Sequence, residues 1–208
     1  MTNNILFNGK RVSPSKVVCV GRNYVAHIKE LNNAIPTESV IFIKPNSAIS
    51  SELLLPGSDE IHYEGELSFL LDGGELVGVG FGLDLTKRQI QNGLKNKGLP
   101  WERAKAFDGS AVFSDFVAIT GAIEALNMEL YINGQLQQKG GCTMMLNSPA
   151  ELVKEISSFM TLEDGDILMT GTPAGVGQVH AGDEFAGRIF NADQLLIEAR
   201  WLVIDPAR

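Results

Sequence analysis

Two apolar segments joined by a short glycine turn constrain the fold more than any other feature of this chain. Between Tyr63–Leu71 and Leu76–Leu83 lies the turn sequence Asp72-Gly73-Gly74, a connection typical of paired antiparallel strands. In the first segment, bulky apolar residues such as Leu67 and Phe69 occupy alternate positions. Alternate residues of a strand point to one face, so the pattern predicts two paired strands with a buried face.

The same hairpin carries three carboxylates. Glu64 and Glu66 are two residues apart, so a strand presents both on one face, where they repel each other unless a cation lies between them. Asp84 follows the second segment and completes an all-oxygen donor set, which suits Mg²⁺ or Mn²⁺ better than Zn²⁺. The alternative is an acidic strand face exposed to solvent.

Composition limits the classes of function. The chain has 208 residues, a net charge of −8 and 44% hydrophobic residues, which predicts one domain over residues 1–208. The acidic balance argues against nucleic-acid binding, because phosphate contacts require a basic surface. No apolar run approaches the ~18 residues of a membrane span, and no signal-sequence pattern is present, so we expect a cytoplasmic protein. Cys19 and Cys142 predict neither a disulfide framework nor a metal site.

Further strands are expected throughout the chain, which makes the fold class β-rich α+β. Asn133-Gly134 is a strong hairpin signal between two of them. The remaining apolar or alternating runs are Ile5–Phe7, Lys16–Val20, Val40–Lys44, Met128–Ile132, Gln135–Lys139, Asp166–Thr170, Glu184–Phe190 and Gln194–Ile204.

Three helices are predicted to cover these strands. Ser148 to Glu151 reads as a capping box, followed by one buried face that comprises Leu152, Val153, Ile156 and Phe159. A second helix is expected to start in the same manner at Thr86 and to end at Gly98. The third covers Tyr24–Leu31.

Other polar residues could take part in chemistry. On a helix, His27 and Glu30 share a face, and a carboxylate beside an imidazole makes a general base or a water activator. Lys105 is a cation between apolar residues that could stabilise an enolate or simply lie at the surface. The loop Gly171–Gly177 lacks the Lys-Ser/Thr ending of a nucleotide loop. It could instead bring backbone N–H groups and the Thr172 hydroxyl to an anion, or be a wide turn.

Taken together, these motifs resemble the fumarylacetoacetate hydrolase family, and more narrowly its small acylpyruvate hydrolase and oxaloacetate decarboxylase branch. The likeness runs from about Lys16 to the C-terminus in unbroken order. It rests on Val18–Tyr24, Phe42–Pro45, His62–Glu66, Leu83–Thr86, Lys97–Trp101, Ala104–Phe107 and Leu168–Gly177. The resemblance implies a mixed β-sandwich roll with a few short covering helices, and a homodimer.

The resemblance also implies roles for individual residues. Glu64, Glu66 and Asp84 would bind Mg²⁺ or Mn²⁺. His27 and Glu30 would form a catalytic dyad on a lid over residues 22–35, and Lys105 would be the active-site lysine. Arg22, Arg88 and Thr172 would contact the substrate. One departure is Thr86-Lys87-Arg88-Gln89, where the family often reads Ser/Thr-Ala-Arg-Asp, and it leaves the substrate open.

The implied substrate is a small 2-oxo acid, and several reactions remain open. The first is hydrolysis of the C–C bond of an acylpyruvate through a metal-stabilised enolate, with water activated by His27. Decarboxylation or keto–enol tautomerisation of oxaloacetate would use the same centre. An isomerase or hydratase of an aromatic-degradation pathway, or a non-catalytic binding protein, are further alternatives. The dyad argues against the last, because a binding protein has no need of it.

Overall fold

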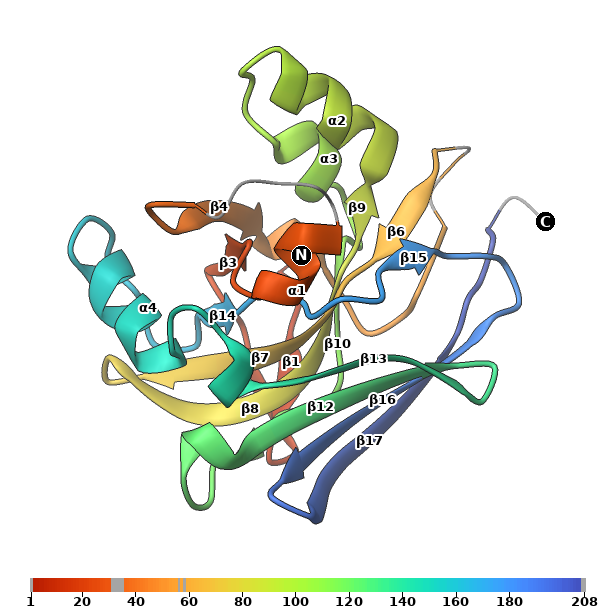
Figure 1. Ribbon diagram of the computed structural model, residues 1–208. Helices are drawn as coiled ribbons and strands as arrows, with labels where there is room; N and C mark the ends of the chain where they lie inside the picture. The colour runs from red at the N-terminus through yellow and green to blue at the C-terminus, as the bar shows by residue number, and fades with distance from the viewer. Residues whose placement is uncertain (1, 31–35, 56, 58, 207–208) are drawn as a thin grey trace.

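The computed structural model describes residues 2–30, 36–55, 57 and 59–206. Within them the chain forms a β-rich fold with a few short helices (Figure 1). The strands are β1 (Ile5–Phe7), β2 (Lys10–Val12), β3 (Lys16–Gly21), β4 (Val40–Pro45), β5 (Ile49–Ser50), β6 (Ile61–Tyr63), β7 (Gly65–Asp72), β8 (Glu75–Asp84), β9 (Thr86–Lys87), β10 (Ala111–Phe113), β11 (Val117–Ala118), β12 (Leu126–Ile132), β13 (Gln135–Gly141), β14 (Ile167–Met169), β15 (Gly177–Gln178), β16 (Glu184–Asn191) and β17 (Gln194–Leu202). The helices are α1 (Val25–Glu30), α2 (Arg88–Asn96), α3 (Glu102–Lys105) and α4 (Pro149–Ser157).

Two sheets pack face to face around β7 and β8. The larger is mixed, in the order β4-β3-β14-β7-β8-β10-β5, with β11 also paired to β8. The smaller, β13-β12-β16-β17, lies across β7 and β8 (Figure 1). This arrangement confirms the expected mixed sandwich roll.

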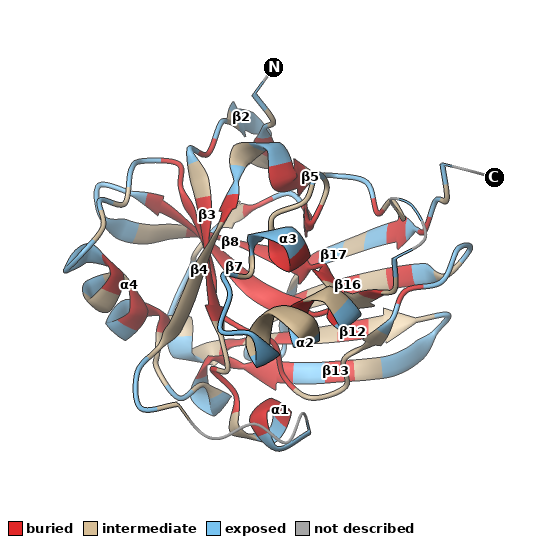
Figure 2. Cartoon of the chain, turned by 90° about the horizontal axis from the view of Figure 1, so that it is seen from above, coloured by how far each residue is buried: buried red, intermediate tan, exposed pale blue. Residues whose placement is uncertain are grey.

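The core fills both faces of β7. Leu67 and Phe69 belong to the cluster between the two sheets, where Phe81 also contacts the ring of Trp201. Leu70 points the other way, into a second cluster. Figure 2 shows the resulting concentration of buried residues along the central strands. The sequence predicted one buried face, and the structure has two because the other side of the larger sheet is covered as well, where Leu70 packs in one cluster with Ile5 and Phe116.

The predicted strands are present, with one interruption. The segment expected to run unbroken from Tyr63 to Leu71 is divided at Glu64, so that β6 joins a small sheet, β15-β6-β9, while β7 starts at Gly65. The Asn133-Gly134 turn is confirmed, with φ values of 51° and 78°. These positive angles match the type of turn that two-residue hairpins favour.

Two details of the helix predictions are wrong. The capping box of α4 is formed, but Phe159 lies beyond the helix end and is 60% exposed, because the last turn tightens to a bond from the Phe159 N–H to the Ile156 carbonyl. Helix α2 is present, yet Thr86 does not cap it, since Thr86 belongs to β9 and Lys87 occupies the N-cap position. Helix α1 confirms the third helix as far as Glu30, and Leu31 lies outside the described residues. Within the described residues, no helix has the length and apolar character to cross a membrane.

Candidate functional site

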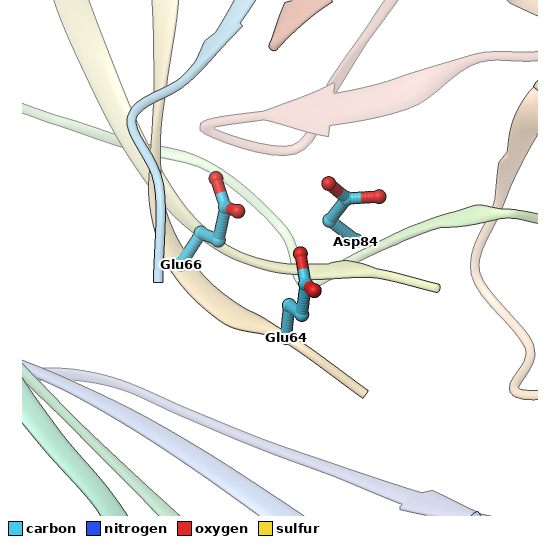
Figure 3. A group of neighbouring side chains, drawn as sticks. All are labelled: Glu64, Glu66 and Asp84. Atoms are coloured by element: carbon cyan, nitrogen blue, oxygen red, sulfur yellow. The ribbon is translucent and has the colours of Figure 1, made fainter. Parts of the chain in front are cut away.

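The three predicted carboxylates lie together in the interior (Figure 3). Glu64 lies in the break between β6 and β7, Glu66 is on β7 and Asp84 ends β8. Each offers an oxygen, and these atoms lie within 4.8 Å of one another. All three side chains are buried, so the alternative of a solvated acidic face does not apply.

Backbone pairing sets this arrangement. The antiparallel β7–β8 register places Glu66 opposite Gly82, and the Asp84 N–H donates to the Glu64 carbonyl at 2.8 Å. Glu66 Oε2 accepts a hydrogen bond of 2.8 Å from the Gly171 N–H. The glycine loop therefore contributes a backbone donor to the site, as its sequence indicated.

Positive side chains surround the carboxylates. The short helix α3 presents Lys105, whose Nζ lies 2.8 Å from Glu64 Oε2 and 2.7 Å from Asp84 Oδ2. Arg88, at the start of α2, donates from Nη2 to Glu64 Oε1 at 2.5 Å. Lys105 also donates to Thr86 Oγ1 at 2.6 Å, which explains why Thr86 faces the site.

Lys44 is a further member of the site that sequence reasoning did not single out. It is fully buried on β4, with Nζ 2.8 Å from Asp84 Oδ1. The same ammonium donates to the carbonyl of Lys105 and, at 3.0 Å, to that of Ser110. A lysine inside the apolar run Val40–Pro45 was the available signal, because a buried ammonium requires anionic or carbonyl partners.

The charges produce opposite pKa shifts. Burial raises the pKa of Glu64, but Lys105, Arg88 and His27 outweigh burial and hold it well below its ordinary value. Burial, reinforced by repulsion from Asp84 and Glu64, raises the pKa of Glu66 well above its ordinary value. Burial lowers the pKa of Lys105, while Asp84 and Glu64 raise it more, to about 12. Negative charge is thus least compensated at Glu66.

The donor set fits a hard divalent cation. Three carboxylates that converge at this spacing provide the oxygen ligands that Mg²⁺ and Mn²⁺ prefer. Asp84 Oδ1 is buried and has no hydrogen-bond partner among the described residues, since its contact with Lys44 is an ion pair without hydrogen-bond geometry. A lone pair of this oxygen is therefore available to a metal.

The predicted dyad is formed beside the carboxylates. His27 Nδ1 lies 3.0 Å from Glu30 Oε2, and Glu30 Oε1 accepts from the Gly175 N–H at 2.9 Å. His27 is buried and lines a small cavity together with Glu64, Glu66 and Lys105. Residues 31–35 of the expected lid lie outside the described residues.

Gln138 holds the opposite wall in place. Its Oε1 accepts from the Gly65 N–H and its Nε2 donates to Thr172 Oγ1, both at 2.8 Å. Thr172 in turn donates to the Gly65 carbonyl at 2.8 Å. The Thr172 hydroxyl proton, predicted to face an anion, is therefore used to tie the loop to β7. Gln138 gave no signal in the sequence, because polar residues in a hairpin strand normally face solvent.

The remaining predicted residues border the same cavity. Arg22, Arg88 and Thr172 all line it, as do Gln91, whose Oε1 accepts from Arg88 Nη1 at 2.8 Å, and Lys95. The fold therefore brings every predicted site residue into one region, drawn from segments between Arg22 and Thr172.

Comparison with known proteins agrees with this architecture. The family model described as fumarylacetoacetate (FAA) hydrolase C-terminal matches residues 16–196. The oxaloacetate tautomerase YcgM of Escherichia coli (strain K12) is 40% identical over 188 residues, which are 82% of this chain and 86% of the relative. The mitochondrial oxaloacetate tautomerase FAHD1 of Bos taurus is 37% identical over 190 residues, 83% and 86% of the two chains.

A solved structure shows the same likeness. The fumarylpyruvate hydrolase of Pseudomonas aeruginosa, in complex with Mn²⁺ and pyruvate, superposes with a TM-score of 0.89 at 30% identity. The match covers 98% of this chain and 96% of the hydrolase. The chain therefore belongs to the fumarylacetoacetate hydrolase family.

Proposed function

We propose that this protein is a divalent-metal-dependent enzyme that interconverts the keto and enol forms of oxaloacetate. The observation that carries the proposal is the buried cluster of Glu64, Glu66 and Asp84, which lies against a small cavity lined by Glu64, Glu66, Lys105 and His27. The names of the two curated relatives, both oxaloacetate tautomerases, support this choice of substrate.

Each residue has a role in this proposal. Glu64, Glu66 and Asp84 hold the cation, which when bound would supply Lewis acidity for the 2-oxo acid. His27, oriented through Nδ1 by Glu30, takes a proton from C3 of the keto form with Nε2. Lys105 provides positive charge beside the 2-oxo oxygen as the enolate forms, and the proton that completes the enol comes from solvent. Arg22 and Arg88 contact carboxylate oxygens, and Thr172 keeps the glycine loop against the substrate. The reverse transfers regenerate the keto form.

Hydrolysis of acylpyruvates is the second candidate, favoured by the same His27–Glu30 pair. In that reaction the imidazole takes a proton from water, which attacks the distal carbonyl. The solved fumarylpyruvate hydrolase with Mn²⁺ and pyruvate supports a divalent metal and a 2-oxo acid. Mg²⁺ as the native metal, a homodimer and a cytoplasmic location remain predictions, and the bovine relative is named mitochondrial.

A metal-dependent assay tests the proposal. Protein stripped with a chelator is supplied with MgCl₂ or MnCl₂ and given oxaloacetate in its enol form, and loss of enol absorbance is followed. We expect metal-dependent acceleration that Glu64→Gln abolishes and Glu75→Gln, an exposed residue on β8, retains. Turnover that survives both chelation and Glu64→Gln would refute the metal-dependent mechanism.

His27→Ala tests the base that both candidates share, and the substrate range of the parent enzyme separates the two. If His27 moves protons, this variant loses tautomerisation of oxaloacetate and cleavage of acetylpyruvate but retains oxaloacetate decarboxylation, which needs neither a base nor water. A parent enzyme that cleaves acetylpyruvate and leaves the oxaloacetate enol unchanged would favour the hydrolase.

A further inference from the structure

The cavity at the metal site is too small for a whole substrate. The inner space, lined by Glu64, Glu66 and Lys105, has a volume of about 30 Å³, which suits little more than one small group. A wider cavity of about 710 Å³ lies outside it. Arg22, Arg88 and Lys95 line both. The part of a substrate remote from its 2-oxo group must therefore lie in the outer cavity, beside these three cations.

Lys95 is the unexplained member of this group. It is half-buried on α2, and its ammonium lies 5.2 Å from the centre of the Trp101 ring. Unlike Lys44 and Lys105, it has no carboxylate within ion-pair distance among the described residues. Burial, followed by repulsion from Arg22 and Arg88, lowers the pKa of Lys95 to about 8. Keeping a positive charge on Lys95 at this half-buried position costs free energy, and a bound anion would offset that cost.

Few acidic side chains of the outer cavity are placed to pair with the Lys95 ammonium. Glu30 is the acidic residue among its described lining residues, and its two oxygens already bond His27 and the Gly175 N–H. Lys95 and Arg22 thus lie at the mouth of the site beside Arg88, which is paired with Glu64, in a protein whose net charge is −8. This grouping of positive side chains at the mouth of the cavity fits an anionic ligand.

We propose that Lys95, with Arg22 and Arg88 beside it, binds the distal carboxylate of a short 2-oxo dicarboxylic acid and thereby selects diacids over acylpyruvates whose distal end is uncharged. The inference rests on the proposed function, because it assumes that the 2-oxo end enters the inner space. Lys95 is a specificity-determining residue in this account and takes no part in proton transfer.

The test compares oxaloacetate with its 4-methyl ester, which differs at the distal end by the loss of one charge. KM, kcat and calorimetric Kd are measured for the parent, Lys95→Met, Lys95→Arg and the control Lys97→Met, an exposed lysine one residue beyond α2. We expect Lys95→Met to raise KM and Kd for oxaloacetate about tenfold, with the ester changed less than twofold and kcat retained. Lys95→Arg should restore most of the diacid affinity, and Lys97→Met should resemble the parent.

Two results would overturn the inference. In the first, Lys95→Met weakens the binding of the diacid and of the ester equally, which indicates a structural effect of the substitution. In the second, the parent already binds both compounds with the same Kd. Failure of the proposed function can be told apart from failure of this inference, because a parent enzyme that converts neither compound can still bind both. The ratio of the two Kd values alone then decides the role of Lys95.

Discussion

The ammonium of Lys44 lies 2.8 Å from Asp84 Oδ1, and neither side chain reaches solvent. Because the same ammonium also bonds the carbonyl of Lys105, it links a proposed metal ligand to the backbone of the proposed active-site lysine. Lys44 is therefore a support for two groups that must keep a fixed separation.

Loss of Lys44 should destabilise the fold through Asp84. In chelator, Lys44→Met should lower the free energy of unfolding by about 3 kcal/mol, because it leaves a buried carboxylate with less compensation. The double variant with Asp84→Asn should cost about 1–3 kcal/mol less than the sum of the single variants. Urea denaturation measures all four proteins, and Lys139→Met, at an exposed ion pair, should cost under about 1 kcal/mol. Strict additivity would disprove the coupling.

Two glycine substitutions should act in opposite directions. A Cβ at Gly65 would lie 2.9 Å from Gln138 Oε1 and 3.1 Å from the Phe81 ring, so Gly65→Ala should destabilise by about 1–3 kcal/mol. Gly93 lies within α2, and a Cβ added there would meet no heavy atom of the surrounding structure within 4 Å, so Gly93→Ala should stabilise by about 0.5–1 kcal/mol. Thermal unfolding compares the two, and a tolerated Gly65→Ala would contradict the close packing.

Asp166 should contribute to acid stability. Burial raises its pKa, but hydrogen bonds from Lys16, the Glu163 N–H and Ser15 outweigh burial and hold the pKa below its ordinary value of 3.8. A pKa lowered by folding stabilises the protein above about pH 4, and that contribution is lost as pH falls through the folded-state pKa. Asp166→Asn should therefore be less stable than the parent at pH 7, by about 2 kcal/mol. The difference in unfolding free energy between the parent and Asp166→Asn should narrow by pH 3 in urea titrations. A difference that stays constant with pH would exclude the ionised carboxylate as its cause.

The preference for a diacid should weaken in alkaline solution. Lys95, whose pKa is lowered to about 8 by burial and by Arg22 and Arg88, also senses Glu64 and Lys105. As pH rises past about 8, the free protein loses this charge, and the ratio of the Kd values for oxaloacetate and its methyl ester should move towards the ratio measured for Lys95→Met. Arginine stays charged in this range, so Lys95→Arg should keep its preference. The same pH profile in both proteins would count against Lys95.

The sequence revealed most of the strands and the carboxylate site, because both depend on short-range spacing. The two-residue separation of Glu64 and Glu66 predicts neighbouring carboxylates, and the two lie together although Glu64 precedes the first residue of β7. Family resemblance added Lys105, which local pattern alone left ambiguous. The single-domain extent of the chain was also predicted from its length, and it stays a prediction.

What the sequence did not reveal depends on distant packing. Lys44 bonds a carbonyl 61 residues along the chain, and Gln138 bonds an N–H group 73 residues away. No regular spacing in the sequence indicates contacts of this kind. Lys95 lies in a polar helix end, where a lysine is ordinarily solvated. The break at Glu64 arises because β6 pairs with β15 and β9, which no pattern within Tyr63–Leu71 could indicate.

The pairing of β7 with β8 also limits how the hairpin can change in length during evolution. A strand that gains one residue turns every later side chain to the opposite face, so a single insertion within β8 before Asp84, outside the turn, would direct Asp84 away from its partners. The pair already contains one irregularity, between Leu70 and Leu71. Insertions of two residues, or of one residue absorbed as a second bulge, are therefore the changes that descendants of this chain can accept while keeping the site.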